Sequence, residues 1–557
     1  MEKKPWETPR YAIWVLVGVF CFVFSTSQMV LALSGSYLIA KHAAKNNDFN
    51  RAAKTYNHLI KMGEEDTKLT QEALIFLIVS GQVDEAVLIA NQLNDTERRT
   101  SATGFVLLAD AVARDELHAA TQIADSYAHF FPDFFNTLVE GWLKISDGNL
   151  AIGVDKFLSL DGNIKNLGLQ NAALAFAMEK KFDQASFYLD SLESRRVLVD
   201  DRQLLAEAQI YSENNQSIKA IDLLKNQHTS SDYFVMSSAI EILENGESLT
   251  FDSFPSIASV IANTFLLIGN ASRISSDRYL PSIFHISLAE HIAREKYFYS
   301  VRLGEEFASL GSSELAQSKF NIVSEEDRNY LRAQLGLVDF LIQQKKHQAA
   351  IRKLKELLEN GNDEYAVVDT LADVYRIEKQ YDNAVFYYDK AVKLISRKGL
   401  KNKWATYFLR GIAHDQSGNW EAAKADLYKA RELSAENPEV LNYLGYSLIE
   451  RREKLIEALE MIENAVSQKP ESGYIVDSLA WCLFRLGRYK EAVAPMERAI
   501  ELEPTDPIVN DHLGDVLWMV GRKREAKFQW NKALIFGATL ENSKKIRYKL
   551  ENGISDL

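Results

Sequence analysis

The sequence predicts an all-α protein built as a superhelix of helical hairpins, an α-solenoid. Two observations lead to this prediction. Alanine, leucine and glutamate are frequent in the second half, and only 10 of 557 residues are proline, a composition that favours helices over strands. Small residues also recur about every 34 residues, and a fixed period of this size is typical of proteins made of stacked helical units.

The period is clearest near the C-terminus, in the segment GRYKEAVAPMERAIELEP at residues 487–504. Its spacing, A-x3-(large)-x2-A-x4-P, recurs 34 residues later and, with one inserted residue, in the preceding unit. The small residues at the position that anchors each unit are Ala52, Ala86, Ala120, Gly153, Ala185 and Ala220 in the first half and Ala316, Ala350, Ala384, Ala423, Ala458, Ala492 and Ala526 in the second.

Each unit is expected to be two antiparallel helices. The small residues let the helix backbones approach, and leucine, tyrosine and phenylalanine on the same face fill the seam. One unit cannot bury its own apolar face, so neighbouring units stack into a continuous core. Between Ala220 and Ala316 the pattern fades, and Pro255 and Pro281 interrupt it, although IASVIANTFLLIG remains apolar. This stretch is predicted to be an irregular helical junction between two arrays.

These spacings resemble the tetratricopeptide repeat (TPR), whose signature is L-G-x2-Y…A-x3-F-x2-A…P. The resemblance implies a superhelix with a concave groove that binds a ligand. The predicted organisation is a signal peptide or membrane anchor at 1–34, a degenerate N-terminal TPR array at 35–228, the irregular junction at 229–296, a C-terminal TPR array at 297–536, and a capping helix and tail at 537–557.

The N-terminal segment Tyr11–Leu33 is mostly apolar and follows Lys3, Lys4 and Arg10. Its length can span a bilayer, whereas its most apolar part, Tyr11–Phe24, also fits the core of a cleaved signal peptide. Both readings stay open. The basic flank favours an exported body, in the periplasm or anchored in the inner membrane. Basic residues that follow the segment leave a cytoplasmic-facing body as the alternative.

Composition and motifs argue against several classes of function. The net charge of −13 disfavours nucleic-acid binding, which needs a basic footprint. The two cysteines form no C-x-x-C pair, and no hydrolase, metalloprotease or P-loop motif occurs. The hexapeptide NDHLGD at 510–515 holds two carboxylates and an imidazole, but the helical frame points His512 away from Asp511 and Asp515. A non-catalytic protein without cofactor or metal ion is therefore expected.

A helical wheel of YIVDSLAWCLFRLG, residues 474–487, places a second face about 120° from the core face. In TPR proteins this face lines the groove, so the resemblance implies a binding surface of carboxylates and exposed aromatic rings. Its predicted members are Asn442, Tyr446, Asp477, Trp481, Phe484, Asp511, Asp515, Trp518, Asp369, Asp373 and Arg376. The lysine and asparagine clamp that grips a terminal carboxylate in some TPR domains is not present at the matching positions.

Residues 437–537 are similar to the C-terminal repeats of exported proteobacterial TPR proteins, including lipoprotein adaptors of carboxyl-terminal processing proteases. The similar segments are NYLGYSLIERREKLIEALEMIENAVSQKP, GYIVDSLAWCLFRLGRYKEA and NDHLGDVLWMVGRKREA. The resemblance implies a scaffold or adaptor of the cell envelope, with protein partners such as an envelope protease or a cell-wall enzyme. Two alternatives remain: an accessory protein of polysaccharide export, and a membrane-tethered cytoplasmic regulator.

Overall fold

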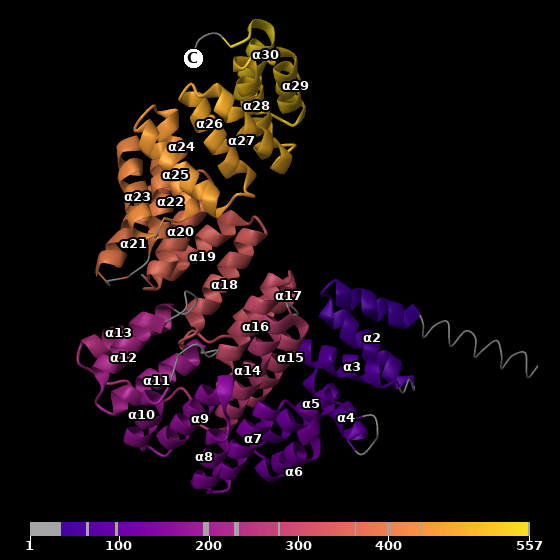
Figure 1. Cartoon of the computed structure of the whole chain (residues 1–557). Coiled ribbons are helices and arrows are strands. Elements are labelled where there is room, and N and C mark those ends of the chain that lie inside the picture. The colour runs from indigo at the N-terminus through magenta and orange to yellow at the C-terminus, as the bar shows by residue number, and fades with distance from the viewer. Residues whose placement is uncertain are drawn as a thin grey trace, which may run out of the picture. The chain divides into compact units, whose positions relative to one another are not determined.

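A computed structural model describes residues 35–62, 66–94, 99–192, 200–227, 233–276, 279–362, 364–397, 400, 403–434 and 436–554. These residues form helices, turns and loops but no strand, which confirms the predicted all-α class (Figure 1). The predicted signal or anchor at 1–34 lies outside the described residues. Among the helices that are described, none has the length and apolar character needed to cross a bilayer.

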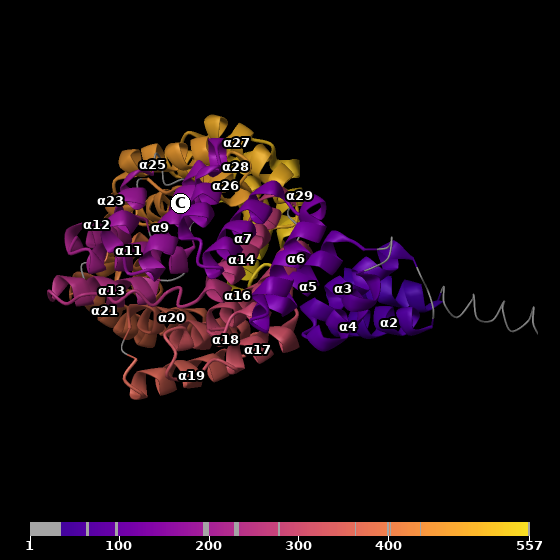
Figure 2. The same cartoon turned by 90° about the horizontal axis from the view of Figure 1, so that it is seen from below.

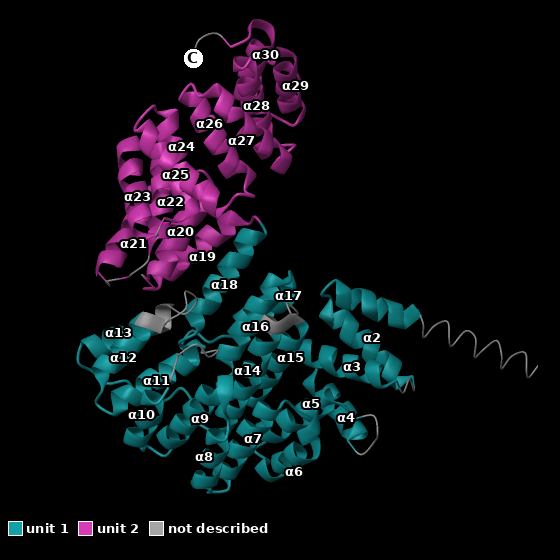
Figure 3. Ribbon diagram, viewed as in Figure 1, with its two compact units in different colours: residues 1–344 teal, residues 345–557 magenta. Residues whose placement is uncertain are grey.

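The chain divides into two compact units, one ending at Gln344 and the other beginning at Lys345 (Figure 3). The domain boundaries expected from the sequence stay a prediction. After a helical segment at 35–45, unit 1 contains α2 Phe49–Lys61, α3 Thr67–Val79, α4 Val83–Leu93, α5 Ser101–Ala113, α6 Leu117–Tyr127, α7 Asp133–Ser146, α8 Leu150–Leu158, α9 Lys165–Met178, α10 Phe182–Asp190, α11 Asp201–Glu213, α12 Ser217–Gln227, α13 Tyr233–Glu244, α14 Ile257–Ser276, α15 Tyr279–Ile292, α16 Tyr297–Ser309, α17 Ser313–Asn321 and α18 Tyr330–Gln343, with short 3-10 turns at Ala128–Phe130 and Gly162–Ile164.

Unit 2 is a run of helical hairpins. It contains α19 His347–Glu359, α20 Tyr365–Ile377, α21 Tyr381–Arg397, α22 Trp404–Gln416, α23 Trp420–Leu433, α24 Pro438–Glu450, α25 Leu455–Gln468, α26 Gly473–Arg485, α27 Tyr489–Leu502, α28 Pro507–Met519, α29 Lys523–Ile535 and α30 Leu540–Asn552. From α20 onward each helix packs on the next along the chain, and α30 packs on α29 at the end of the stack.

The residues that anchor the repeat occupy equivalent places in both units. All of these small residues, from Ala52 to Ala526, are buried, and all except Ala350, which lies on the first helix of unit 2, lie on the second helix of a hairpin. The twelve alanines among them have an exposed fraction of 0%. The period therefore predicted where the two helices of each pair approach each other, because only a small side chain fits there.

The inner face of the N-terminal hairpins is covered by the chain itself. Helices α14 and α15 pack against each other and against α3, α5 and α7, which are first helices of successive hairpins (Figures 1 and 2). Apolar residues are buried all round α14, among them Val260, Ile261, Ala262 and Leu266, as expected for a helix inside a core. The region predicted to be an irregular junction thus contributes two core helices, and α3, α5 and α7 present no open groove.

Candidate partner-binding surfaces

The predicted groove residues of α26 form a buried network with α28. The Nδ1 atom of His512 lies 3.0 Å from both carboxylate oxygens of Asp477. The Trp481 ring stacks on the His512 ring at 3.9 Å and on the Phe484 ring at 4.8 Å. Its Nε1 donates a hydrogen bond of 2.6 Å to Glu450. Trp481 is 8% exposed, so the network is part of the core of unit 2.

Two effects oppose each other at His512. Burial lowers the pKa of the imidazole, whereas the negative charge and hydrogen bond of Asp477 raise it, and Asp511 and Asp515 add to the rise. The net pKa lies above the ordinary value of 6.5, because the carboxylates stabilise the imidazolium by more than burial costs. His512 thus interacts directly with Asp477 of the neighbouring hairpin, whereas Asp511 and Asp515, from which the helical frame directed it away, act on it only through their charge.

The other acidic pair of the predicted groove binds the last helix. Lys549 of α30 places Nζ 2.8 Å from Asp511 and 2.7 Å from both oxygens of Asp515. Asp515 also accepts a 2.8 Å hydrogen bond from Nε1 of Trp530. Burial raises the pKa of the Asp515 carboxyl, while Lys549 opposes the rise. No group of His, Cys, Asp and Glu within the described ranges is arranged to hold a metal ion.

The exposure expected for this part of the groove is wrong. Trp481 and Phe484 are buried rather than exposed, and Trp518 is half-buried, its ring 5.3 Å from that of Trp530. The helical wheel gives the direction of a side chain but not the distance to the next hairpin. In unit 2 the first helices of neighbouring hairpins, α24, α26 and α28, pack closely enough to cover the predicted groove face. Asn442 is likewise buried. A role of these residues in partner binding stays a prediction.

The predicted residues of α20 are more accessible. Asp369, Asp373 and Arg376 are half-buried, and Arg376 Nε lies 3.7 Å from Asp373. Asp369 accepts hydrogen bonds of 3.0 Å from the hydroxyls of Tyr365 and of Thr406 on α22. The hydrogen bond from Thr406 joins the acidic pair of α20 directly to α22.

The next two first helices, α22 and α24, carry half-buried aromatic rings. Phe408 is half-buried, and its ring meets that of half-buried Tyr443 edge to face at 5.8 Å. The Tyr443 hydroxyl donates to Asp415 at 2.9 Å, and Tyr446 is also half-buried on α24. We use the name acidic–aromatic face for five residues of α20, α22 and α24: Asp369, Asp373, Arg376, Phe408 and Tyr443.

Both carboxylates of the acidic–aromatic face have a pKa above the ordinary value of an aspartate. Burial, and next the negative charge of Asp373, raise the pKa of Asp369 to about 6. Burial also raises the pKa of Asp373, although its hydrogen bond from Tyr388 and the charge of Arg376 oppose this. A positively charged group brought to this face would stabilise both carboxylates, so the face is suited to a basic partner.

Phe408 and Tyr443 were not among the residues predicted from the sequence. The signal was present for Phe408, because it lies 34 residues, one repeat period, before Asn442 and so occupies the equivalent position in its own unit. The preceding interval, 39 residues from Ala384 to Ala423, interrupts the period and obscured the alignment of this unit.

Two family models, each described as a tetratricopeptide repeat, match residues 451–507 and 368–397. These segments are tetratricopeptide repeats. They cover the hairpin of α20 and α21 and the TPR helices from α25 to α27. A comparison with curated proteins found no match.

Several solved structures are similar to the chain. One is the APC/C hetero-tetramer Cut9-Hcn1, with 13% identity, a TM-score of 0.39 and coverage of 95% of this chain and 98% of that one. A tetratricopeptide repeat protein from Parabacteroides merdae has 16% identity and a TM-score of 0.37, covering 47% and 100%. Yeast Tom70 has 14% identity and a TM-score of 0.30, covering 95% and 96%.

Proposed function

We propose that this protein is a non-catalytic scaffold that binds partner proteins through the acidic–aromatic face of unit 2. The observation that supports the proposal is the pair of half-buried carboxylates with raised pKa values, Asp369 and Asp373 on α20, followed by the half-buried rings of Phe408 on α22 and Tyr443 on α24. Aromatic side chains supply contact area at low entropic cost, and the carboxylates select and orient basic groups. The preferred partner is a protein segment that carries lysine or arginine next to apolar residues.

A protein partner is favoured over a polysaccharide. Recognition of a sugar by stacking needs one open face of an aromatic ring. Trp481 is 8% exposed and stacks on the His512 and Phe484 rings, and Trp518 packs on Trp530 with the Lys523 amine 5.0 Å from its ring centre. Together with Tyr446, which is half-buried on α24, these tryptophans are the rings that could stack on sugars in an accessory role in polysaccharide export.

We further propose that the protein acts in the bacterial cell envelope as an adaptor for a protease or a cell-wall enzyme. The apolar run Tyr11–Leu33 and its basic flank support export of the body. Protease added to the periplasmic side of spheroplasts should then digest the body. A protected body would instead support the membrane-tethered cytoplasmic regulator.

Crosslinking mass spectrometry in intact cells tests the binding proposal. The test variant is Asp369→Asn/Asp373→Asn/Phe408→Ala, which removes two charges and one ring. The matched control is Asp382→Asn/Phe386→Ala on α21, where both side chains are exposed. We expect the wild-type chain and the control to crosslink to the same proteins and the test variant to lose them. Identical partners for all three chains would contradict the proposal.

A further inference from the structure

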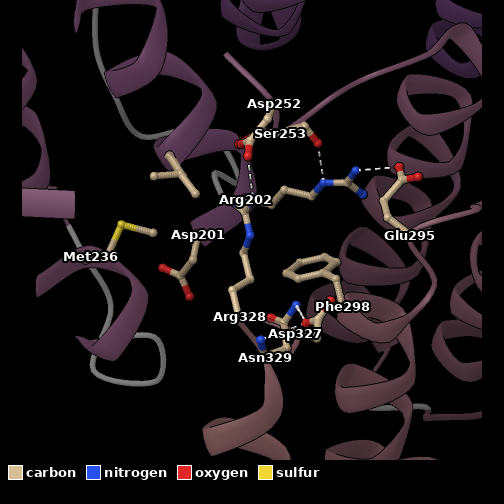
Figure 4. A pocket seen from close by; sticks show the side chains of 11 residues that line it. Asp201, Arg202, Met236, Asp252, Ser253, Glu295, Phe298, Asp327, Arg328 and Asn329 are labelled. Carbon is tan, nitrogen blue, oxygen red and sulfur yellow. Dashed lines mark hydrogen bonds and ion pairs between the residues drawn. The ribbon is translucent and has the colours of Figure 1, made fainter. Parts of the chain in front are cut away.

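Unit 1 contains a cavity of about 160 Å³ whose arginine side chains are bound by the cavity's own wall. Figure 4 shows Arg202, which donates hydrogen bonds to the Ser253 carbonyl at 2.8 Å and to Glu295 at 2.7 Å. Arg328 forms an ion pair of 2.5 Å with Asp252. Both cations of this cavity are thus engaged within the protein, whereas cations without such partners lie in unit 2.

The last two helices of unit 2 are basic in an acidic chain. Residues 522–552 hold nine lysines and arginines but only three aspartates and glutamates, whereas the whole chain has a net charge of −13. Arg522, Lys545 and Lys549 pair with carboxylates. Six cations form no ion pair within the part of the chain that the structure describes, and neither does the carboxylate of Glu551. These cations are Lys523, Arg524, Lys527, Lys532, Lys544 and Arg547.

Two of these cations share one face of α29 with apolar side chains. The residues of this stripe, at spacings of four, four and three, are Arg524, Phe528, Lys532 and Ile535. Such spacings place the side chains on one face of a helix. The opposite face is buried with Trp530, whereas Phe528 is 60% and Ile535 is 77% exposed. The stripe is therefore free to meet something outside the chain.

The same pattern continues on α30. Leu540, Lys544 and Tyr548 follow one another at intervals of four residues, and all three are exposed, Leu540 by 80%. Ile535 and Leu540 flank the short turn between α29 and α30, which pack on each other. We use the name basic–apolar end for the seven residues of these two stripes. Along both stripes, apolar side chains are interleaved with cations.

This interleaving indicates which kind of partner fits. The core of a protein interface is depleted of lysine and of other charged residues. Stacking on nucleotides needs rings, which Ile535 and Leu540 lack. A lipid surface accepts both kinds of side chain from one helix face, because apolar groups enter the acyl boundary while the long stems of lysine and arginine keep their charges among the headgroups. The Lys532 amine lies 5.6 Å from the centre of the Phe528 ring, so a cation and an apolar group lie together.

We propose that the basic–apolar end docks unit 2 on a membrane surface that contains anionic phospholipids. The exposed apolar side chains enter the boundary between headgroups and acyl chains, and the unpaired cations of the two stripes meet lipid phosphates. The negative charge of the lipid is required, because it supplies the carboxylate partners that these cations lack within the protein. The site uses other helices than the acidic–aromatic face and does not depend on it.

Local fluorescence of the full-length chain tests the proposal. An environment-sensitive fluorescent amino acid replaces Ile535 or, as the control, Ile456, an exposed side chain of α25. The probes are vesicles of phosphatidylcholine alone and vesicles of phosphatidylcholine and phosphatidylglycerol in equal parts. We expect a blue shift at position 535 with the mixed vesicles only, and none at position 456. Because the fluorophore reports its own surroundings, insertion of residues 11–33 does not produce this shift.

Charge variants with the fluorophore at position 535 test the role of the cations. The test variant is Arg524→Gln/Lys532→Gln/Lys544→Gln, and the matched control, which removes three exposed lysines elsewhere in unit 2, is Lys379→Gln/Lys393→Gln/Lys490→Gln. We expect the test variant to need at least tenfold more mixed vesicles for half of the shift, because each cation near an anionic surface adds to the affinity. The control should change this concentration less than twofold.

Phe528→Ser/Leu540→Ser tests the apolar contribution and should weaken vesicle binding at least fivefold. Both side chains are exposed, so the thermal midpoint should stay unchanged and a loss of binding is not a loss of fold. An equal shift with phosphatidylcholine alone, or equal binding by the two charge variants, would overturn the proposal, and so would unchanged binding by the serine variant. Soluble poly-L-glutamate that causes the same shift without vesicles would indicate an acidic polypeptide and overturn the lipid partner.

Discussion

At the scale of single residues, the acidic side chains of unit 2 differ in how their charge is balanced. Asp477 and Asp515 face His512 and Lys549 inside the core. Asp369 instead faces hydroxyl donors and lies near a second carboxylate, Asp373. The charge of Lys403 and the two hydroxyl donors offset only part of the cost of ionising Asp369. Carboxylates whose charge is only partly balanced cost stability and cluster at functional sites.

This difference gives a pH-dependent stability. The pKa of Asp369 is raised from 3.8 to about 6, so the folded state binds the proton more tightly than the unfolded state does. The cost of ionised Asp369 is therefore full above pH 6 and disappears as the pH falls toward 4. We expect Asp369→Asn to stabilise unit 2 by about 1–3 kcal/mol at pH 7.5, with a smaller gain at pH 5. Urea unfolding at both pH values measures the gain, and an equal or larger gain at pH 5 would contradict the assignment.

A glycine of the repeat gives a second test at this scale. A Cβ added to Gly514 would lie 2.3 Å from the Trp530 ring, whereas one added to Gly411 would lie 3.0 Å from Leu427. Trp530 is fully buried and cannot move aside. We expect Gly514→Ala to destabilise unit 2 by about 1–3 kcal/mol, and Gly411→Ala to stay within about 1 kcal/mol of wild type, because alanine favours helix. Thermal unfolding compares the two, and equal losses would show that the Trp530 contact is not the cause.

At the scale of helices, α30 is held by a charge as well as by packing. Its Ile546 is buried, and the side chain of its Lys549 is 17% exposed where it meets Asp511 and Asp515. The last helix of a solenoid must present a polar outer face and still cover the core of the preceding repeat. Lys549 helps α30 to cover that core because it neutralises Asp511 and Asp515 of α28.

Removing the positive charge of Lys549 should weaken the packing of α30 on the preceding repeat. Lys549→Met leaves buried Asp515 without its partner, and we expect a loss of about 3–5 kcal/mol at pH 8. Adding Asp511→Asn and Asp515→Asn to Lys549→Met should recover much of that loss, because no unpaired charge then remains. Chemical unfolding of the two variants tests this. If the triple variant were no more stable than Lys549→Met, packing rather than charge would hold α30.

The hairpins and their register could be predicted from the sequence, but the packing between hairpins could not. Ala52, Ala316 and the other small residues predicted the hairpins and their register, because close backbone approach restricts those positions to small side chains. The sequence of α14 and α15 is apolar on all sides, so it indicated burial but not which helices bury it. The burial of Trp481 and the pairing of Lys549 with Asp515 depend on distances between neighbouring hairpins, which a helical wheel does not contain.

At the scale of the whole chain, the two units use the same repeat in different ways. Unit 1 covers the inner face of its hairpins with α14 and α15, so its accessible feature is a small cavity rather than a groove. Unit 2 buries the predicted groove at α26 and α28 but leaves α20, α22 and α24 with a half-buried acidic and aromatic surface. Binding of partners in unit 2 is therefore expected at its first hairpins.

Site-specific photo-crosslinking in intact cells tests this central claim most directly. A photoreactive phenylalanine analogue is placed at Phe408 or, as the control, at exposed Phe386 on α21. We expect discrete crosslinked protein products from position 408, none from 386, and loss of the products when Asp369→Asn and Asp373→Asn are added. No product from position 408, or the same products from both positions, would contradict the account.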